Sequence, residues 1–416
     1  MQSEADIVVI GAGAAGLMAA IHAARTRSDA SILMLDGARK LGAKILIAGG
    51  GRCNVTHDVV DENAFAGSSR NAIRKVLRRF DVPATTAFFD ELGVKLKREE
   101  TGKLFPVTDD ARTVLNALVG EARERGVTIA YPRRVQGLRR DSGGFTIDAS
   151  GEDVRASRVI VATGGMSIPK SGSDGFGYSL VRSVGHTTTS LFTPGLVPLT
   201  LPRDHVLCTL SGVTLPATLE LRSGTGKKLV SFTDSTLLTH FGLSGPSVLD
   251  ISRYYLHAVH EDPGTELLIN FLPDTTPDGL QQDLQALGAV QVGTFLRARL
   301  PERLARALCE QAHVSFATSA HQLTREARRA LSHAVTQLSL RVSDSRGYNF
   351  AEVTAGGVPL SEVRLETMES RVCEGLYLCG EICDVDGRIG GYNFQWAWSS
   401  GFVAGISAAR AAGAFR

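Results

Sequence analysis

Short apolar runs separated by a glycine turn mark the start of the chain. Residues 7–10 (IVVI) form an uninterrupted apolar run, which is typical of a parallel strand buried on both faces. A helix-forming stretch follows over 14–24, and a second run, 31–35 (SILML), ends at Asp36. Strand, glycine turn, helix and second strand predict a βαβ unit at the N-terminus.

The pattern then changes to mainly helical sequence as far as about Gly126. It predicts helices near 70–80, 84–92 and 110–125, and a loop rich in glycine and lysine from Gly42 to Asn54. From Val127 the pattern predicts strands, at 127–130, 135–138, 145–147 and 159–161. Turn signals at 142–144 and 150–151 separate the last three, as in a small antiparallel meander that leads into a core strand.

A stretch of different texture begins at Pro194 and Pro198. Short strand candidates continue to about Phe271, and amphipathic helical sequence follows from Asp278 to Leu338. The remainder returns to strand and glycine patterns and ends in a helix rich in Ala and Gly over 398–412. We therefore predict an α/β protein with a Rossmann-type domain in two parts, 1–194 and 346–416, and an inserted β-rich and helical domain, 195–345.

Length and charge fit this division. A chain of 416 residues exceeds the roughly 250 to 300 residues over which one core keeps growing. The 45 basic and 43 acidic side chains give a formal charge of +2, too small for the one-signed field of a general nucleic-acid binder. The most basic segment, Arg70–Phe80, reads as a helix with a solvated basic face and an apolar face formed by Ile73, Val76, Leu77 and Phe80. Nucleic acid is therefore not an expected partner.

The cysteines and the N-terminus exclude other classes. None of the six cysteines forms a Cys-x-x-Cys pair, so we expect reduced thiols and no metal site. The apolar N-terminal stretch lacks a basic leader and is broken by glycines, and no run reaches the roughly 18 apolar residues of a membrane span. These features predict a cytoplasmic protein without a membrane partner, whereas the oligomeric state has no sequence signal.

A phosphate-binding pattern stands between the first strand and the first helix. Gly11, Gly13 and Gly16 form a GxGxxG motif, with Ala14 and Ala15 at the start of the helix. Such glycines allow a tight turn and a close approach of backbone to pyrophosphate, while the helix N-terminus favours anions. Asp36 lies 20 residues after Gly16 at the end of the second strand, where a carboxylate accepts hydrogen bonds from ribose hydroxyls. The motif in this setting predicts dinucleotide binding.

A second loop carries both glycines and cations. Gly49, Gly50 and Gly51 precede Arg52, Cys53 and Asn54, and Lys40 and Lys44 lie just before them. Three consecutive glycines expose backbone amides and admit a flat ligand, and Lys44 and Arg52 are suited to neutralising phosphate charge. A merely flexible loop is the alternative.

Five motifs together resemble a bacterial flavoprotein family. They are GAGAAG from Gly11, GGGRCNVT from Gly49, ATGGMSIPKSGSDGFGY from Ala162, THFGLSGP from Thr239 and GEICDVDGRIGGYNFQWAWSSG from Gly380. The family is often labelled NAD(P)/FAD-dependent oxidoreductase, or aminoacetone oxidase-like flavoprotein. The resemblance covers the chain end to end. It implies tightly held FAD, a FAD-binding domain made from both ends of the chain, and an insertion over the flavin.

Further candidate contacts follow from this resemblance. Ala162, Thr163 and Gly164 end an apolar strand that would run beside the cofactor. Gly380 and Glu381 follow the strand 376–379, where related flavoproteins place an acid that bonds the ribityl chain; here Glu replaces the commoner Asp, which puts the direct contact in doubt. Gly391, Tyr392 and Asn393 precede the C-terminal helix, whose amides are suited to face flavin N1 and O2. Glycines needed only for packing are the alternative, and the remaining candidate FAD contacts are Gly37, Val135 and Asp386.

Catalytic candidates are few. His240 is the best acid or base of the inserted domain, against the alternative of a structural histidine, and Tyr392 is a candidate for approaching the substrate. His186 reads as structural, at the start of a strand-like segment. A flavin-proximal dithiol is not expected near Cys53, because Asp58 occupies the position of the partner cysteine.

The sequence thus predicts an FAD-dependent oxidoreductase. Electrons from a small amine, thiol or hydride donor would pass through the flavin to oxygen or another acceptor. With a single convincing GxGxxG, a resident NAD(P)H domain is not expected, and only a transient visit by NAD(P)H stays open. The alternatives are an FAD-dependent RNA-modifying or nucleic-acid-associated protein and a non-catalytic flavin redox sensor.

Overall fold

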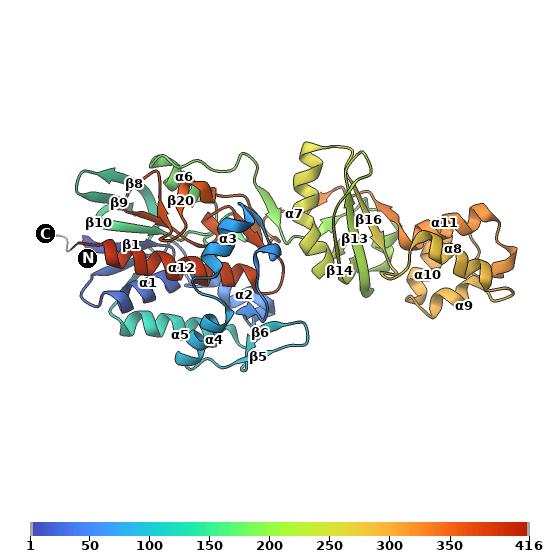
Figure 1. Cartoon of the computed structure of the whole chain (residues 1–416), viewed down its shortest axis with the longest axis horizontal. Coiled ribbons are helices and arrows are strands. Elements are labelled where there is room, and N and C mark those ends of the chain that lie inside the picture. The colour runs from blue at the N-terminus through green and yellow to red at the C-terminus, as the bar shows by residue number, and fades with distance from the viewer. Residues whose placement is uncertain (1–2, 414–416) are drawn as a thin grey trace. The chain divides into compact units, whose positions relative to one another are not determined.

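A sheet with parallel strands at its centre organises the computed structural model, which describes residues 3–413. The parallel strands lie in the order β22-β10-β1-β2-β7, of which β10 and β1 are labelled in Figure 1. Their bounds are β1 Glu4–Ile10, β2 Ile32–Leu35, β7 Thr128–Ala130, β10 Glu152–Val161 and β22 Leu376–Leu378. Residues 5–10 of β1 are all buried, which explains the uninterrupted apolar run. The prediction of a Rossmann-type α/β fold is confirmed.

Antiparallel strands extend this sheet at two places. β8 (Val135–Asp141) and β9 (Gly144–Ala149) form the predicted meander beside β10. β20 (Val363–Arg364) and β21 (Glu369–Ser370) continue it beyond β22. The remaining short strands of this part are β3 Thr56–His57, β4 Phe65–Gly67, β5 Leu96–Arg98, β6 Lys103–Pro106, β19 Val353–Ala355 and β23 Val385–Gly387.

Two helices from opposite ends of the chain pack together against the sheet. α1 (Ala14–Thr26) lies beside α12 (Tyr392–Ala411), as Figure 1 shows. A Cβ added at Gly405 would lie 2.2 Å from the Ala19 carbonyl oxygen, and one added at Gly401 would lie 2.5 Å from that of Ala15. Glycine is therefore required at both positions, because the two backbones approach too closely for a side chain.

The helical predictions are confirmed in part. α3 (Arg70–Leu77) buries its predicted apolar face, and α4 (Val82–Glu91) and α5 (Ala111–Glu124) lie close to their predicted ranges. The prediction of a loop from Gly42 to Asn54 was wrong, because α2 (Ala43–Gly51) occupies much of this segment. Residues 48–50 within α2 have non-helical backbone angles. The C-terminal helix begins at Tyr392, directly after the left-handed Gly391, rather than at Trp398, and both Trp396 and Trp398 are buried in the core. No strand begins at His186, whose imidazole is held instead by Glu362 and Ser370.

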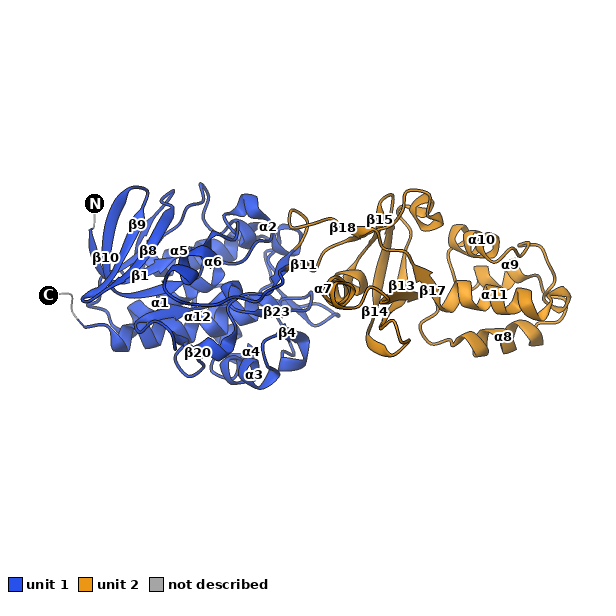
Figure 2. Ribbon diagram, turned by 90° about the horizontal axis from the view of Figure 1, so that it is seen from above, with its two compact units in different colours: residues 1–192, 352–416 blue, residues 193–351 orange. Residues whose placement is uncertain are grey.

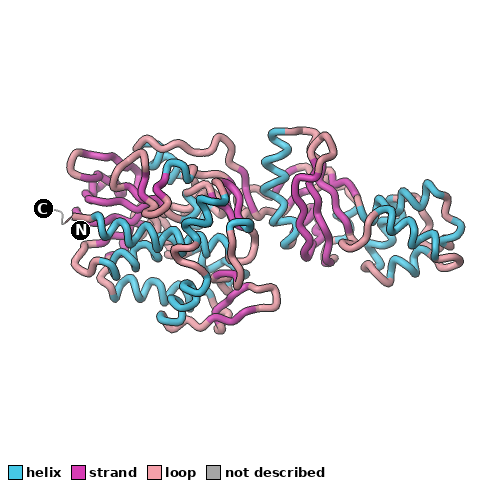
Figure 3. The backbone as a smooth tube through the Cα atoms, in the orientation of Figure 1, coloured by secondary structure: helices cyan, strands magenta, loops and turns pink. Residues whose placement is uncertain are grey.

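The chain forms two units, residues 1–192 with 352–416, and residues 193–351 (Figure 2). The second unit has a seven-stranded sheet in the order β17-β16-β13-β14-β15-β12-β18 and a group of helices, coloured separately in Figure 3. The sequence missed α7 (Pro246–Glu261), which packs on this sheet. The strands of this sheet are β12 Leu199–Thr200, β13 Thr214–Arg222, β14 Lys228–Thr239, β15 Gly242–Ser244, β16 Glu266–Asn270, β17 Leu338–Leu340 and β18 Asp344–Ser345. The further helices of the second unit are α8 Pro277–Ala286, α9 Val292–Arg297, α10 Glu302–Gln311 and α11 Arg325–Thr336. The first unit also contains α6 Phe176–Ser183.

No helix within residues 3–413 combines the length and the apolar character that crossing a bilayer requires.

Candidate functional site

The carboxyl ends of four parallel strands meet at one edge of the sheet. Ile10 of β1 lies opposite Leu35 of β2 and Val161 of β10, and Val161 lies opposite Leu378 of β22. The ladder continues one residue further, since the Gly11 N–H donates to the Leu35 carbonyl at 2.8 Å. Loops that follow such strand ends form the crevice in which open α/β sheets bind ligands. The predicted motifs at Gly11, Asp36, Ala162 and Gly380 are thus brought together.

The glycines of the GxGxxG loop have two different structural roles. A Cβ at Gly16 would lie 1.9 Å from the Gly11 carbonyl oxygen, and a Cβ at Gly11 would lie 2.4 Å from that of Ala162. Both glycines are needed for close packing of helix on strand. At Gly13 neither packing nor backbone conformation requires a glycine. A Cβ there would meet no atom within 4 Å, and the φ of −82° suits any residue. The space at Gly13 is therefore open to a ligand.

This open space lies at the N-terminus of α1. The N–H groups of Ala14, Ala15 and Gly16 precede the first intrahelical bond, which runs from the Leu17 N–H to the Gly13 carbonyl at 2.9 Å. No side chain caps the helix at Gly13. Uncapped amides and the positive end of the helix dipole together favour an anion such as a phosphate.

Asp36 is held at the end of β2 by backbone amides. Its Oδ2 accepts from the Ala12 N–H at 2.6 Å and its Oδ1 from the Ala38 N–H at 2.7 Å. Each carboxylate oxygen keeps acceptor capacity for a ligand hydroxyl. Beside it, a Cβ at Gly37 would lie 3.2 Å from the Arg134 side chain, so there is little room for a larger residue.

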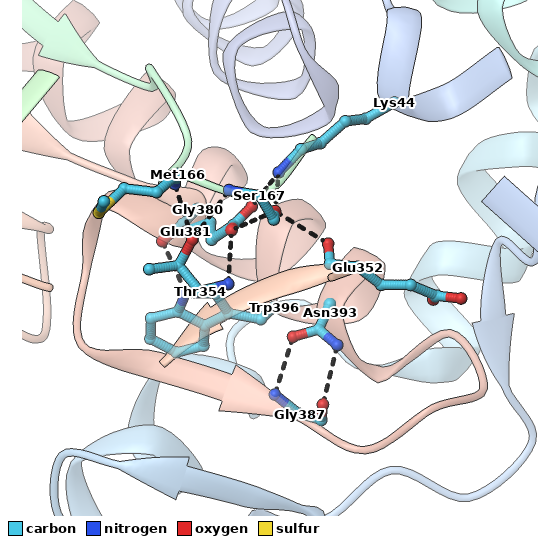
Figure 4. A network of polar contacts seen from close by, with 10 residues as sticks. All are labelled: Lys44, Met166, Ser167, Glu352, Thr354, Gly380, Glu381, Gly387, Asn393 and Trp396. Atoms are coloured by element: carbon cyan, nitrogen blue, oxygen red, sulfur yellow. Dashed lines mark hydrogen bonds and ion pairs between the residues drawn. The ribbon is translucent and has the colours of Figure 1, made fainter. Parts of the chain in front are cut away.

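Glu381 is the centre of a polar network at the end of β22 (Figure 4). Its Oε2 pairs with the Lys44 ammonium at 2.7 Å, and its Oε1 accepts from the Ser167 hydroxyl at 3.0 Å. Lys44 also donates to the Ser167 Oγ at 2.6 Å. Gly164 and Gly165 pass close by, since a Cβ at Gly165 would lie 2.8 Å from Glu381 Oε1. The network fixes the carboxylate against the turn that follows β10.

Two residues of this network were missed in the sequence. Thr354 donates its backbone N–H to Glu381 Oε1 at 2.9 Å and accepts from the Met166 N–H at 2.7 Å through its hydroxyl (Figure 4). Ser167 belongs to the same motif as Gly164, so its proximity in sequence was a usable signal. Thr354 belongs to none of the motifs, and only the fold brings it to Glu381.

The hydrogen-bond ladder of α12 begins after the first three residues of the helix. The first intrahelical bond runs from the Gln395 N–H to the Gly391 carbonyl at 3.0 Å, which leaves the amides of residues 392–394 without intrahelical partners. Gly391 has a φ of +96°, and its Cβ would lie 2.6 Å from the Thr56 backbone. The Asn393 side chain both donates to and accepts from the backbone of Gly387 (Figure 4). The turn before α12 is thus rigidly defined.

Tyr392 is the first residue of α12 and packs against aromatic rings. It stacks on His57, a residue outside the predicted site, with ring centroids 5.0 Å apart and an interplanar angle of 20°. His57 contacts the Thr101 carbonyl through Nε2 at 3.0 Å. The phenol ring is therefore supported on one face by a side chain that is itself anchored.

Buried polar atoms without partners lie in the same segments. Asn54 Oδ1 and Thr163 Oγ1 have no hydrogen-bond partner within residues 3–413. A buried polar group without a partner costs free energy, so a bound ligand that supplies one is favoured. Gly164, the next residue after Thr163, has a φ of +70°, and Gly380 has a φ of +76°.

The other candidates differ in what surrounds them. Arg52 is already paired with Glu99 at 2.6 Å and lies 4.0 Å from the centroid of the Phe105 ring, while Lys40 is exposed. Cys53 is buried, and this desolvation raises the pKa of its thiol to about 12, so it is not a nucleophile. Val135 is buried at the start of β8, Asp386 is buried in β23, and His240 is exposed in the turn after β14 of the second unit.

Sequence relatives match nearly the whole chain. It is 36% identical over 407 residues to a 3-dehydro-bile acid delta(4,6)-reductase of Clostridium scindens, covering 97% of this chain and 98% of the relative. It is 35% identical over 401 residues to a ribosomal RNA dihydrouridine synthase of Escherichia coli, covering 96% of each chain. A ribosomal RNA dihydrouridine synthase of Haemophilus influenzae is 32% identical over 418 residues, covering 99% of this chain and 100% of the relative.

Among solved structures, a quinol fumarate reductase chain of Escherichia coli matches with a TM-score of 0.54 and 16% identity, covering all of this chain and 72% of the other. At this identity the likeness concerns the fold. A family model, described as the HI0933-like protein Rossmann domain, matches residues 5–407. The chain therefore belongs to the HI0933-like family.

Proposed function

We propose that this chain is an FAD-dependent reductase that saturates a carbon–carbon double bond conjugated to a carbonyl group. The observation that carries the proposal is the convergence of an open anion site at Gly13, the anchored carboxylate of Asp36 and the Lys44–Glu381 pair at one sheet edge. This donor set fits a cofactor with two phosphates, a ribose and a polar chain.

The residues divide the binding of FAD among them. The amides of residues 14–16 would hold the pyrophosphate, and Asp36 would accept from the adenosine ribose. Glu381, with Lys44, would face the ribityl chain, and the positive end of the α12 helix dipole would face the ring. Asn54 Oδ1 and Thr163 Oγ1 would find partners in the bound molecule.

Bound FAD supplies a two-electron carrier that takes a hydride from a donor and passes it to an acceptor. The hydride donor that we propose is NADH or NADPH, bound transiently. The single GxGxxG motif of the sequence is assigned to FAD, so the chain has no second motif of this kind for a resident nicotinamide nucleotide. The activity is that of an oxidoreductase enzyme.

The acceptor is inferred from the chemistry shared by the named relatives. A bile acid delta(4,6)-reductase removes ring double bonds, and a dihydrouridine synthase saturates the uracil ring. In a 3-oxo steroid and in uracil alike, the double bond is conjugated to a carbonyl. Hydride addition at the far carbon places charge on the carbonyl oxygen, and a proton then completes the reduction at the near carbon.

Tyr392 is the residue that we propose as the proton donor. Its phenol O–H is a proton source. Its ring, at the start of α12, stacks on the His57 ring. His240 stays a prediction, as the second candidate for an acid or base.

A two-step titration tests the function. Purified protein is reduced anaerobically with NADH or NADPH, and test acceptors are then added while flavin absorbance is followed. A 3-oxo steroid with conjugated double bonds and a uridine-containing RNA are the two acceptors, and saturated analogues are the controls. Recovery of the oxidised spectrum with the conjugated acceptor alone is expected. A protein that binds no FAD, or whose reduced flavin no conjugated acceptor oxidises, contradicts the proposal.

A further inference from the structure

Three side chains of the second unit form a stack in which Phe241 and Arg346 are half-buried and Phe350 is exposed. The guanidinium carbon of Arg346 lies 4.4 Å from the centroid of the Phe241 ring and 3.8 Å from that of the Phe350 ring. His240 extends the stack, with its ring edge-on to Phe241 at 5.1 Å. Phe350 is 51% exposed, so much of its ring is open to water. We call Phe241, Arg346 and Phe350 the aromatic stack.

The sheet of this unit fixes the stack. β12 pairs with β15 on one side and with β18 on the other, so that Leu199 lies opposite both Leu243 and Ser345. Phe241 immediately precedes β15 and Arg346 immediately follows β18, which brings the two side chains together. The Leu201 N–H also donates to the Phe241 carbonyl at 3.0 Å. The stack is therefore built on a hydrogen-bonded ladder rather than on a free loop.

Arg346 differs from other arginines that lie over aromatic rings. Arg52 is paired with Glu99, and Arg306 is paired with Glu302. Within residues 3–413 the Arg346 side chain has neither an ion pair nor a hydrogen bond, and the rings are its contacts. Its five N–H donors are therefore available to a ligand, and a planar fork of donors matches a phosphate.

We propose that the aromatic stack binds an unpaired nucleotide of an RNA substrate, with a base on the open face of Phe350 and a phosphate on Arg346. The inference rests on the proposed function. Of the two acceptor classes considered there, 3-oxo steroids and uridine-containing RNA, it selects RNA. Bases stack on aromatic rings, and single-stranded RNA is recognised largely in this way. A steroid gains most from an enclosed apolar pocket, whereas the Phe350 ring is open to water.

The small net charge of the chain does not oppose this assignment. A charge of +2 excludes binding by a broad positive field, but stacking and one guanidinium contact need no such field. It follows that binding should depend only weakly on salt, with each phosphate contact contributing a slope of about −0.7 for a single strand.

The test measures binding of a fluorescently labelled oligouridylate to the full FAD-loaded chain by anisotropy, at about 50 and 200 mM salt. Phe350→Ala should weaken binding by about 10-fold, while Phe350→Tyr, which keeps the aromatic face, should stay within about twofold of the wild type. Arg346→Gln should weaken binding and remove about one phosphate contact from the salt slope. Leu229→Ala, at a side chain 47% exposed in the same unit, and Arg329→Gln, on the exposed face of α11, are matched controls that should leave binding unchanged.

The proposal is overturned if the wild type does not bind the oligouridylate at about 50 mM salt, or if Phe350→Ala binds as well as the wild type. It is also overturned if Phe350→Ala weakens binding of a 3-oxo steroid and leaves the oligouridylate unaffected. In each case the flavin titration can still succeed, and the proposed function then stands. A different result would separate the two proposals in the other direction. If the oligouridylate binds through the stack but no conjugated acceptor reoxidises the flavin, the RNA-binding role of the stack is supported and the proposed function is contradicted.

Discussion

The Lys44 ammonium lies 2.7 Å from the Glu381 carboxylate, although the two residues are 337 positions apart in the sequence. The pair joins the N-terminal and C-terminal parts of the Rossmann-type unit at the edge where the strands end. Both side chains are largely removed from water, with exposed fractions of 27% and 19%. A charge left without its partner at such a place is costly, so the pair offers a sensitive probe of the site.

Replacing Glu381 by Gln should weaken FAD retention by about 10-fold, because Lys44 loses its counter-charge and the turn at Ser167 loses a strong acceptor. The FAD dissociation constant is measured by fluorescence titration of apo-protein. Glu4→Gln is the matched control, since it removes an exposed pair, 3.8 Å from Arg155, on the same unit. Equal losses in the two variants would refute a specific role of Glu381.

Replacing Asp36 by Ala should also weaken FAD binding, by about 10- to 100-fold, because a charged acceptor for the ribose hydroxyls is lost. FMN lacks the adenosine ribose, and its affinity should not change. Measuring both dissociation constants on one preparation therefore separates ribose recognition from general damage to the apo-protein. A parallel loss of FMN binding would contradict the ribose role.

Gly13 and Gly16 should respond differently to alanine. A Cβ at Gly13 meets no protein atom within 4 Å, so Gly13→Ala should leave the thermal stability of the apo-protein nearly unchanged and reduce FAD affinity. A Cβ at Gly16 would lie 1.9 Å from the Gly11 oxygen, so Gly16→Ala should destabilise the apo-protein by about 1–3 kcal/mol. Thermal unfolding without FAD, paired with FAD titration, checks both outcomes. A clear loss of apo-protein stability in Gly13→Ala would show that protein atoms, not a ligand, fill this space.

His22 should make stability fall with acid. Burial, and secondarily the charge of Arg25, lowers its pKa from 6.5 to about 3, and its Nε2 has no hydrogen-bond partner within residues 3–413. Between these two values the unfolded chain binds a proton that the folded chain does not. Stability is therefore unaffected by His22 above about pH 6.5 and decreases, by about 1.4 kcal/mol per pH unit, as the pH falls towards 3.

His22→Leu should remove this contribution. The variant and the wild type should show similar pH dependence above about pH 6.5 and diverge below it, with the variant more resistant to acid. Urea unfolding at a series of pH values gives the comparison. Parallel curves for the two proteins down to about pH 4 would show that His22 is not the group responsible.

Local patterns in the sequence determined the Rossmann-type unit. The apolar run at 7–10, the glycine loop and Asp36 specify a strand, a turn and a helix through contacts close in sequence, and backbone sterics allow few alternatives. The apolar face of Arg70–Phe80 was predictable for the same reason, because helical periodicity decides which side chains turn inward. Predictions failed where tertiary packing overrides local preference, as in α7 and in the first turns of α12.

Only the tertiary structure decided how distant segments meet. Thr354 and His57 belong to no recognisable chemical motif, yet one anchors Glu381 and the other supports Tyr392. The stacking of Arg346 on Phe241 likewise depends on the pairing of β12 with both β15 and β18. Sequence alone specifies such contacts weakly, because a long-range contact is set by strand order and register, which the whole chain must satisfy together.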